Sequence, residues 1–292
     1  EEFKPRFVVE IGSNDGTLTK MFQDEGCLVL GVDPSGVESS VPVVRDYFKP
    51  ELALPLPKAD LVLANHVFAH VDNLAGLVDS VRMLLAPNGV FIFEAAYGLD
   101  LLQHHYFDTI YHEHLDYHTV RPLAGFFESL GLTLFRVERN NAKGGSIRGF
   151  VCHAGMREIE ISVALAQSIE HAYGADKPKV FGAFTDRLLE RTNAVQQQIG
   201  EEQVIGYGAS AGPIATMYHL GIEQRVRWLV DDSERRHNLY APHSNLLVRP
   251  TDTLYFILER DLLVPEGRAL LLAWRYAEQI KARHPNMEFI VP

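Results

Sequence analysis

Cysteine is scarce in this sequence. Only Cys27 and Cys152 occur among the 292 residues, and each sits in or beside an apolar stretch. No cysteine pair therefore has the spacing of a zinc-binding motif, and we expect no metal in this chain. A single disulfide between the two is an open alternative, but reduced thiols in a cytoplasmic enzyme are favoured.

Basic residues are also few. Lysine and arginine number 27 against 38 acidic residues, which gives a net charge of −11. Binding to nucleic acid or to an anionic membrane needs clustered basic side chains, so neither is expected as a partner. No apolar run approaches the ~18 to 20 residues that span a bilayer, and no signal peptide opens the chain. These absences, with a hydrophobic fraction of 47%, predict a cytoplasmic globular protein.

The first 155 residues alternate between apolar runs and helical patterns. Apolar runs cover residues 7–11, 27–33, 59–68 and 90–97, helical patterns cover 17–26 and 74–85, and a hairpin-like pair follows at 132–139 and 146–155. Strands that alternate with helices predict an α/β domain with a parallel sheet and helices on both faces. We therefore expect one domain over residues 1–155.

The pattern changes after that domain. Residues 158–199 are polar with a helical period, interrupted near 174–180, and predict a helical arm. Strand–turn–helix signals then begin again, which predicts a second, smaller α/β lobe and a domain over residues 156–292. Because the first apolar run begins as early as Phe7, we also expect this chain to be part of a longer one.

A glycine turn, "VVEIGSNDG", follows the first predicted strand. In open parallel sheets, ligands bind beyond the carboxyl ends of the strands, where Glu10, Gly12 and Asn14 would lie. The spacing of Gly12 and Gly16 differs from the turn that cradles a pyrophosphate, and acidic residues there would suit a positively charged ligand. Asp33 ends the second strand about 20 residues later, a position typical of a carboxylate that binds ribose hydroxyls. A ligand with ribose and positive charge but no phosphate is S-adenosylmethionine; the alternative is a purely structural turn.

Several segments together resemble a known family. They are "VVEIGSNDGTL", "GVDPSG", "ADLVLANHVFAHVDNL", "FEAAYGLDLLQHHYFDTIYHEHLDYHT", "KGGSIRGFV", "GYGASAGP" and "VDDSERRHNLYAP". In this order they resemble class I S-adenosylmethionine-dependent methyltransferases, and more narrowly the NDP-sugar C-methyltransferases of deoxysugar biosynthesis. The resemblance implies a Rossmann-like methyltransferase sheet, a helical arm and a smaller Rossmann-like lobe. It implies these cofactor contacts: Glu10, Gly12, Asn14, Asp33, Asn65 and His66.

Histidines cluster in "FDTIYHEHLDYHTV". A zincin motif would need a histidine at position 116, where the chain has Asp116, so that motif fails. A two-histidine, one-carboxylate iron site stays open because its spacing is loose. A polar loop rich in histidine by chance is the other structural alternative.

Acid–base catalysis is the interpretation we favour for this cluster. An imidazole titrates near pH 6.5 and can accept a proton at neutral pH. A C3 proton beside the carbonyl of a 4-ketosugar is acidic enough for such a base to remove. The resemblance assigns this work to the Tyr-His-Glu-His segment, with His114 as the general base, Glu113 anchoring the sugar or orienting the base, and Tyr111 as a second proton-transfer group.

Two further glycine-containing turns complete the list of candidate residues. Lys143 and Gly145 lie in "KGGSIRG", read either as a turn at the mouth of the active site or as a simple hairpin. Many relatives have histidine where this chain has Lys143. In the second lobe, "GYGASAG" places Tyr207 and Ser210 where they could bind a nucleotide-sugar phosphate, although the turn could also be purely structural.

The sequence therefore predicts an S-adenosylmethionine-dependent methyltransferase that acts on C3 of a nucleotide-linked ketosugar. The alternatives are an O- or N-methyltransferase on another small acceptor, an NAD(P)-dependent oxidoreductase that uses the second glycine turn, and a non-catalytic binding domain. The family's fuller members carry an N-terminal zinc-binding lobe, and no segment of this sequence matches it.

Overall fold

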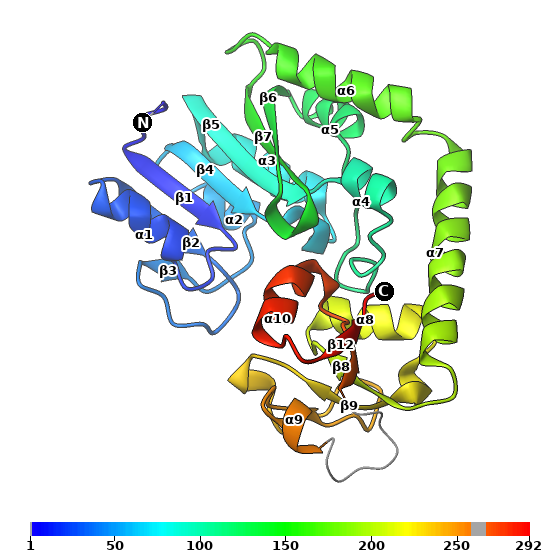
Figure 1. Cartoon of the computed structure of the whole chain (residues 1–292). Helices are drawn as coiled ribbons and strands as arrows, with labels where there is room; N and C mark the ends of the chain where they lie inside the picture. Colours follow the sequence, from blue (N-terminus) through cyan, green and yellow to red (C-terminus); the bar gives the residue numbers. More distant parts are fainter. Residues whose placement is uncertain (1, 258–266) are drawn as a thin grey trace. The chain divides into compact units, whose positions relative to one another are not determined.

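The computed structural model describes residues 2–257 and 267–292, which form two compact units (Figure 1). Unit 1 comprises Glu1–Gln103 and Glu113–Lys177, and unit 2 comprises His104–His112 and Pro178–Pro292. The chain therefore leaves unit 1 at His104, returns to it at Glu113 within the histidine segment, and leaves it again after Lys177.

Unit 1 is built on a seven-stranded sheet with the order β3-β2-β1-β4-β5-β7-β6. The strands from β1 to β5 are parallel, whereas β7 runs antiparallel to both β5 and β6. Their bounds are β1 Phe7–Ile11, β2 Leu28–Val32, β3 Val43–Val44, β4 Ala59–Asn65, β5 Leu85–Ala96, β6 Leu132–Asn140 and β7 Ser146–His153. Val8 and Val9 are fully buried, because a central parallel strand is covered on both faces.

Helices cover the sheet of unit 1. They are α1 Thr17–Asp24, α2 Pro50–Ala53, α3 Leu74–Leu84, α4 Gly98–His104, α5 Val120–Ser129 and α6 Ile161–Tyr173, with 3₁₀ turns at Phe68–His70 and Ala142–Gly144. Asn73 caps helix α3 from the position before it, because its side chain accepts a hydrogen bond from the Gly76 amide at 2.9 Å. Aromatic rings fill part of the core, with Phe68 stacked on Phe93 at 4.7 Å between ring centroids.

Unit 2 is built on a five-stranded parallel sheet with the order β10-β9-β8-β11-β12. The strands are β8 Val204–Tyr207, β9 Val226–Val230, β10 Val248–Arg249, β11 Arg268–Leu270 and β12 Glu288–Ile290. The helices are α7 Pro178–Ile199, α8 Ala211–His219, α9 Thr253–Ile257 and α10 Ala277–Arg283, with 3₁₀ turns at Glu223–Arg225, Glu234–Arg236 and Trp274–Tyr276.

The α/β fold class is confirmed, with a mostly parallel seven-stranded sheet followed by long helices and a smaller parallel sheet. The expected boundary after residue 155 differs from the division into units. Helix α6 belongs to unit 1 because it packs against β6 and α5, so only α7 of the expected helical arm lies in unit 2. Strand β5 also begins earlier than the apolar run at 90–97, since Leu85–Gly89 joins it.

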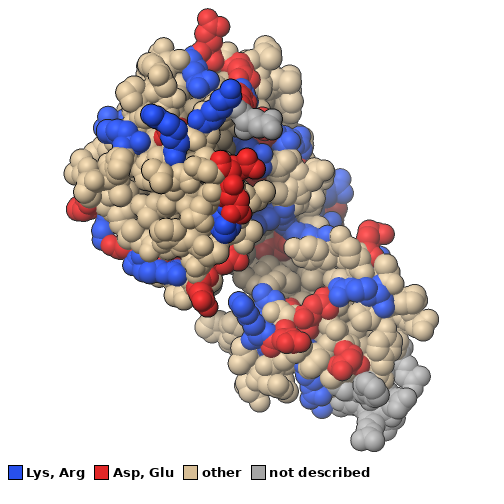
Figure 2. Space-filling model, turned by 90° about the vertical axis from the view of Figure 1, so that its left-hand side faces the viewer, with Lys and Arg blue, Asp and Glu red and all other residues tan. Residues whose placement is uncertain are grey.

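Charged side chains are intermingled on the surface. On the face drawn in Figure 2, lysine and arginine alternate with aspartate and glutamate among the described residues and do not form one broad basic patch. None of the helices in the described ranges is long and apolar enough to cross a membrane.

Candidate active site

A cavity of about 530 Å³ opens at the carboxyl edge of the unit 1 sheet. Gly12 lines it from the end of β1, and Asn65 and His66 line it from the end of β4. Three of the six residues expected to contact the cofactor therefore share this cavity. Glu10, Asn14 and Asp33 do not line it, although Val32 and Pro34 on either side of Asp33 do.

Gly12 occupies a position that only glycine fits without strain. Its φ is +73°, and a Cβ atom there would lie 2.7 Å from a methyl group of Val67. The Gly12 amide donates to the Val32 carbonyl at 2.8 Å, which ties the turn to β2. The turn therefore packs closely against Val67 and β2, and Gly12 presents backbone without a side chain to the cavity.

Asp33 supports the turn from the end of β2. Its Oδ2 accepts from the Asn14 amide at 2.8 Å, and its Oδ1 accepts from the Ser35 amide at 2.7 Å. Burial acts to raise the pKa of Asp33, but hydrogen bonds from Ser35 and Asn14, with the charge of Arg45, outweigh it and hold that pKa below its usual range. The carboxylate thus orders the loop around the cavity.

Glu10 does not line the cavity. Its side chain is buried, and its carboxylate accepts a hydrogen bond from the Thr19 hydroxyl of α1. Burial raises the pKa of Glu10, with the Thr19 hydrogen bond opposing the rise. In the structure this residue joins β1 to α1.

Other residues of the cavity were not found from the sequence. Asp46–Pro50, which follow the short strand β3, line the cavity. His70 and Asp72 line it as well. Strand β3 is only two residues long, so its apolar signal is too short to detect. The aromatic pair in "DYFK" was the available signal for that side of the cavity.

Glu94 is another residue that the sequence did not single out. It lies near the end of β5, and its Oε1 is 3.2 Å from the Nε2 of His66. Its Oε2 accepts from Asn140 Nδ2 at 3.0 Å and from an Arg148 guanidinium nitrogen at 2.9 Å. Burial first, and then the charge of Lys143, hold the pKa of His66 below its usual range against the pull of Glu94.

The boundary between the two units falls inside the histidine segment, between His112 and Glu113. On the unit 1 side, His70 Nδ1 is 2.8 Å from the Glu113 carbonyl oxygen. The ring of His70 is 4.9 Å from the ring of His114, measured between centroids. Since His70 lines the cavity, it connects His114 to that cavity.

On the unit 2 side, the residues before Tyr111 are firmly anchored. Phe107 is buried in the core of unit 2. Arg275 donates two hydrogen bonds to Asp108, each of 2.8 Å, and the Ile110 carbonyl oxygen lies 2.8 Å from His219 Nε2. Tyr111 itself packs edge-on against His112, with 6.3 Å between centroids.

His118 has a structural position. It is buried, its ring meets Phe68 edge-on at 5.7 Å, and its carbonyl oxygen accepts from the Gly98 amide at 2.7 Å. Burial lowers its pKa. Within residues 2–257 and 267–292, no group of three or more His, Cys, Asp or Glu side chains is arranged to hold a metal ion.

Lys143 and Gly145 occupy the turn before β7. Lys143 has a φ of +50°, and burial lowers its pKa while Glu94 opposes that shift. Gly145 lies so close to Asp100 that a Cβ atom would be 2.5 Å from that carboxylate. Its carbonyl oxygen accepts from the Tyr97 amide at 3.1 Å. Gly145 thus shapes the turn, whereas Lys143 carries the charge.

Unit 2 has its own cavity of about 470 Å³ at the carboxyl edge of its sheet. Tyr207, Gly208 and Ser210 line it, so the two residues expected there lie together. The Tyr207 hydroxyl donates to Asp232 at 3.0 Å, and burial raises the pKa of Tyr207. Arg283 pairs with the same aspartate at 2.8 Å.

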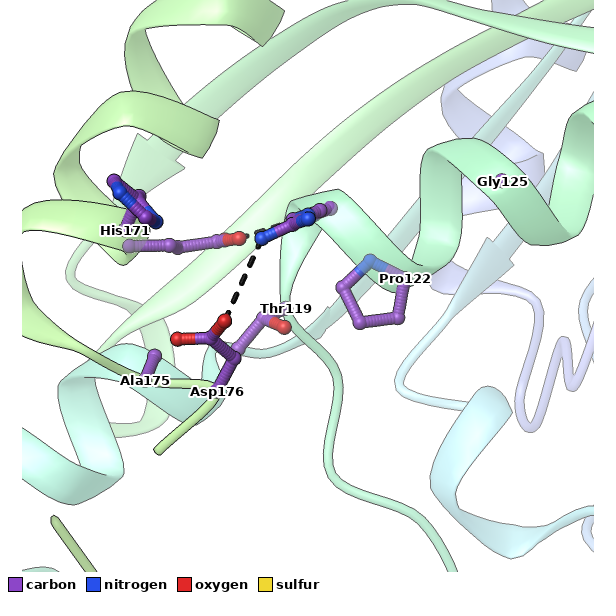
Figure 3. A pocket seen from close by; sticks show the side chains of 8 residues that line it. Thr119, Pro122, Gly125, His171, Ala175 and Asp176 are labelled. Atoms are coloured by element: carbon purple, nitrogen blue, oxygen red, sulfur yellow. Dashed lines mark hydrogen bonds and ion pairs between the residues drawn. The ribbon is translucent and has the colours of Figure 1, made fainter. Parts of the chain in front are cut away.

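A third cavity, of about 460 Å³, lies between α5 and α6 in unit 1 (Figure 3). Glu170 is buried there, and it accepts hydrogen bonds from the Tyr97 hydroxyl at 2.9 Å and from the amides of Val120 and Arg121 at 2.6 and 3.0 Å. Arg121 also pairs with Asp176 at 3.5 Å. Glu170 thus supplies the acceptor for the first amides of α5, a structural role.

Comparison with known proteins gives matches along nearly the whole chain. The family model described as "Methyltransferase domain" matches residues 1–137, and the model described as "C-methyltransferase C-terminal domain" matches residues 141–291. C-methyltransferase NovU of Streptomyces niveus is 31% identical over 291 residues, which cover 94% of this chain and 67% of NovU. Ubiquinone biosynthesis O-methyltransferase of Histophilus somni is 24% identical over 102 residues, which cover 30% of this chain and 43% of that enzyme.

Among solved structures, magnesium protoporphyrin IX methyltransferase of Synechocystis with bound SAH is 16% identical, with a TM-score of 0.40. It covers 52% of this chain and 76% of that one.

The parallel sheet, the glycine turn beside its cavity and the methyltransferase match define a class I methyltransferase with S-adenosylmethionine as its cofactor. The match over residues 141–291, together with the identity to NovU, shows that this chain belongs to the C-methyltransferase family. It is an enzyme that transfers a methyl group to carbon.

Proposed function

We propose that this enzyme methylates C3 of a nucleotide-linked ketosugar. The family membership and the sequence resemblance support an acceptor of that class. The carbon beside a carbonyl must lose a proton before it can accept a methyl group, so the enzyme needs a positioned base. The observation that carries the proposal is the contact of His114 with His70, which lines the cavity at the sheet edge.

The cavity fits S-adenosylmethionine. Gly12 lines the cavity without a side chain, and aromatic residues on the β3 side, Tyr47 and Phe48, offer faces for an adenine ring. When bound, the cofactor supplies a methyl group on a positively charged sulfur. Gly12, Asn65 and His66 would line the ligand directly. Asn14 and Asp33 would shape its ribose side, and Glu10 would hold β1 against α1.

The residues of the histidine segment would handle the acceptor. His114 would take the proton from C3 through an imidazole nitrogen. The exposed Glu113, one residue before it, would anchor sugar hydroxyls. Tyr111, which lies in unit 2, would be the second proton-transfer group. Lys143 would place its charge near the acceptor oxygen, with Gly145 holding that turn.

Unit 2 would bind the nucleotide part of the acceptor. Its cavity is lined by Ser210 at the start of α8, Tyr207, and two arginines, Arg236 and Arg283. Backbone amides at the start of a helix and guanidinium groups both bind phosphate oxygens. In this proposal unit 1 binds the methyl donor and unit 2 binds the nucleotide part of the acceptor.

The test is product analysis by mass spectrometry after incubation with S-adenosylmethionine and a panel of nucleotide-linked ketosugars. One member of the panel should gain a single methyl group on carbon. His114→Asn should lower its turnover by about 10² to 10⁴-fold, the range for loss of a general base, while binding of S-adenosylhomocysteine is retained. His171→Asn, beside the cavity of Figure 3, is the matched control and should leave turnover unchanged. Failure of the wild-type enzyme to methylate any ketosugar would contradict the proposal.

A further inference from the structure

A buried carboxylate stands beside the cofactor cavity without a role in the proposal above. Glu94 is 7% exposed and divides its two oxygens between different partners. Oε2 accepts from both Asn140 and Arg148, whereas Oε1 pairs with the Nε2 of His66. This division matters because it fixes which nitrogen of the His66 ring carries the proton.

The tautomer of His66 follows from the contact with Glu94. A carboxylate oxygen can only accept, so the Nε2 of His66 must donate to it. In a neutral imidazole the other nitrogen, Nδ1, then carries a lone pair and can only accept. Burial and the charge of Lys143 hold the pKa of His66 below its usual range, so the ring is neutral at neutral pH.

His66 is held at the cavity by its backbone as well. It has a φ of +55°, in the left-handed region that few non-glycine residues adopt, and its amide donates to the Glu94 carbonyl oxygen at 2.6 Å. Such a conformation is costly and persists where the surroundings impose it, often at functional sites. The same glutamate therefore binds both the backbone and the ring of His66.

The two sides of the cavity differ in character. Tyr47 and Phe48 follow β3, whereas Asn65 and His66 lie at the end of β4. In the order β3-β2-β1-β4 these strands are three strand spacings apart, about 14 Å. An adenine ring suits the aromatic side, which leaves the amino-acid end of the cofactor for the polar side at β4.

We propose that Glu94 fixes His66 as a hydrogen-bond acceptor for the ammonium group at the amino-acid end of the cofactor. This inference rests on the proposed placement of S-adenosylmethionine in this cavity. A neutral ring with its lone pair toward the ligand accepts from an ammonium, whereas an imidazolium would repel it. His66 touches the cofactor, and Glu94 is a positioning residue that acts through it.

Glu94→Gln tests the effect of Glu94 on the His66 tautomer without changing the packing, because glutamine has the size and shape of glutamate. Asn140 and Arg148 both donate to Oε2, so the amide oxygen must take that place and the NH₂ group must face His66. His66 Nε2 must then accept, its proton moves to Nδ1, and the acceptor toward the ligand is lost. A mismatch of this kind costs about 1 to 3 kcal/mol, which is roughly a 5- to 150-fold loss of affinity.

The measurement is calorimetric titration with two ligands. S-Adenosylhomocysteine carries the amino-acid end, and 5′-methylthioadenosine has the same nucleoside without it. Glu94→Gln should weaken binding of the first by the factor given and leave binding of the second unchanged. Glu138→Gln is the matched control, because Glu138 also approaches Arg148, at 4.0 Å, but does not contact His66.

Two further measurements keep the inference testable if Glu94→Gln is unstable. Asparagine tolerates the left-handed backbone at this position, so His66→Asn is a second variant. It should also weaken binding of S-adenosylhomocysteine and leave binding of 5′-methylthioadenosine unchanged. Long-range ¹H–¹⁵N spectra of the histidines should show the Nε2–H tautomer for His66 in the wild-type protein. An Nδ1–H tautomer there, or equal losses for both ligands, overturns the inference. If the wild-type protein binds neither ligand, the placement of the cofactor fails with it.

Discussion

The glycine turns of the two units use the same construction. In unit 1, the Gly12 amide donates to Val32, and Asp33 accepts from the amides of Asn14 and Ser35. In unit 2, the Gly208 amide donates to Val230 at 2.8 Å, and Asp231 accepts from Ala209 at 2.7 Å and Ser233 at 2.8 Å. Each aspartate follows the second strand of its unit and binds the loop after the first.

The two turns differ in what surrounds them. The loop between glycine and helix is Ser13–Gly16 in unit 1 and only Ala209 and Ser210 in unit 2. Arg236 also donates a hydrogen bond of 3.0 Å to Asp231, whereas Asp33 accepts from the backbone amides of Asn14 and Ser35. A carboxylate after the second strand is therefore first a support for the loop. The neighbouring residues, arginines in unit 2 and aromatic and polar residues in unit 1, decide which ligand each turn would favour.

The largest expected effect comes from replacing Gly12 or Gly208 by alanine. At Gly208 the φ is +110°, and a Cβ atom would lie 2.8 Å from the Cβ of Ala273 and 3.1 Å from its backbone nitrogen. Gly208→Ala should therefore lower the free energy of unfolding by about 2 to 4 kcal/mol. Gly12→Ala should cost less, about 1 to 2 kcal/mol, because its φ is nearer the allowed region and its neighbour is a side-chain methyl group.

Urea denaturation measures both losses, and calorimetry with S-adenosylhomocysteine separates them. Gly12→Ala should lower the affinity for S-adenosylhomocysteine, because Gly12 lines the cavity. Gly208→Ala should leave that affinity unchanged. Equal effects on ligand binding would mean that the two turns are not functionally distinct.

Replacing Asp33 or Asp231 by asparagine has the next largest expected effect on stability. An amide has only one oxygen for the two loop amides that each carboxylate binds, so one N–H loses its acceptor, at about 1 to 3 kcal/mol. Asp33→Asn should speed hydrogen exchange at Asn14 or Ser35, and Asp231→Asn should do so at Ala209 or Ser233. Unchanged exchange at these amides would show that the aspartates do not support the loops.

The smallest effect concerns Glu10, which lies two residues before Gly12, where unit 2 has Gly206 before Gly208. Burial raises the pKa of Glu10 above 4.5, so the unfolded chain releases this proton at lower pH than the folded one. The stability that this group contributes is complete below pH 4.5 and is lost as the pH rises through the folded pKa. Glu10→Gln should therefore gain thermal stability relative to the wild type between pH 4.5 and 7. A constant difference in Tm across that range would contradict this.

Much of the fold followed from local patterns. The apolar runs at 7–11 and 59–68 predicted strands β1 and β4, because buried parallel strands are apolar along most of their length. The glycine turn predicted Gly12 at the sheet edge, the family resemblance implied Asn65 and His66, and the structure brings these three residues to one cavity. The contacts of Asp46–Pro50 with that cavity were missed, because the two residues of β3 carry no periodic signal.

The sequence by itself determined the fold class, the cofactor class and the edge of the sheet at which the cavity lies, because each depends on local periodicity and motif order. Only the tertiary structure decided which side chains meet. Glu10 accepts a hydrogen bond from Thr19, Asp33 binds the loop after β1, and Glu94 contacts His66. Packing and burial decide such contacts between residues that are distant in sequence. The division of the histidine segment between the units is likewise a matter of long-range contacts, which place His112 with unit 2 and Glu113 with unit 1.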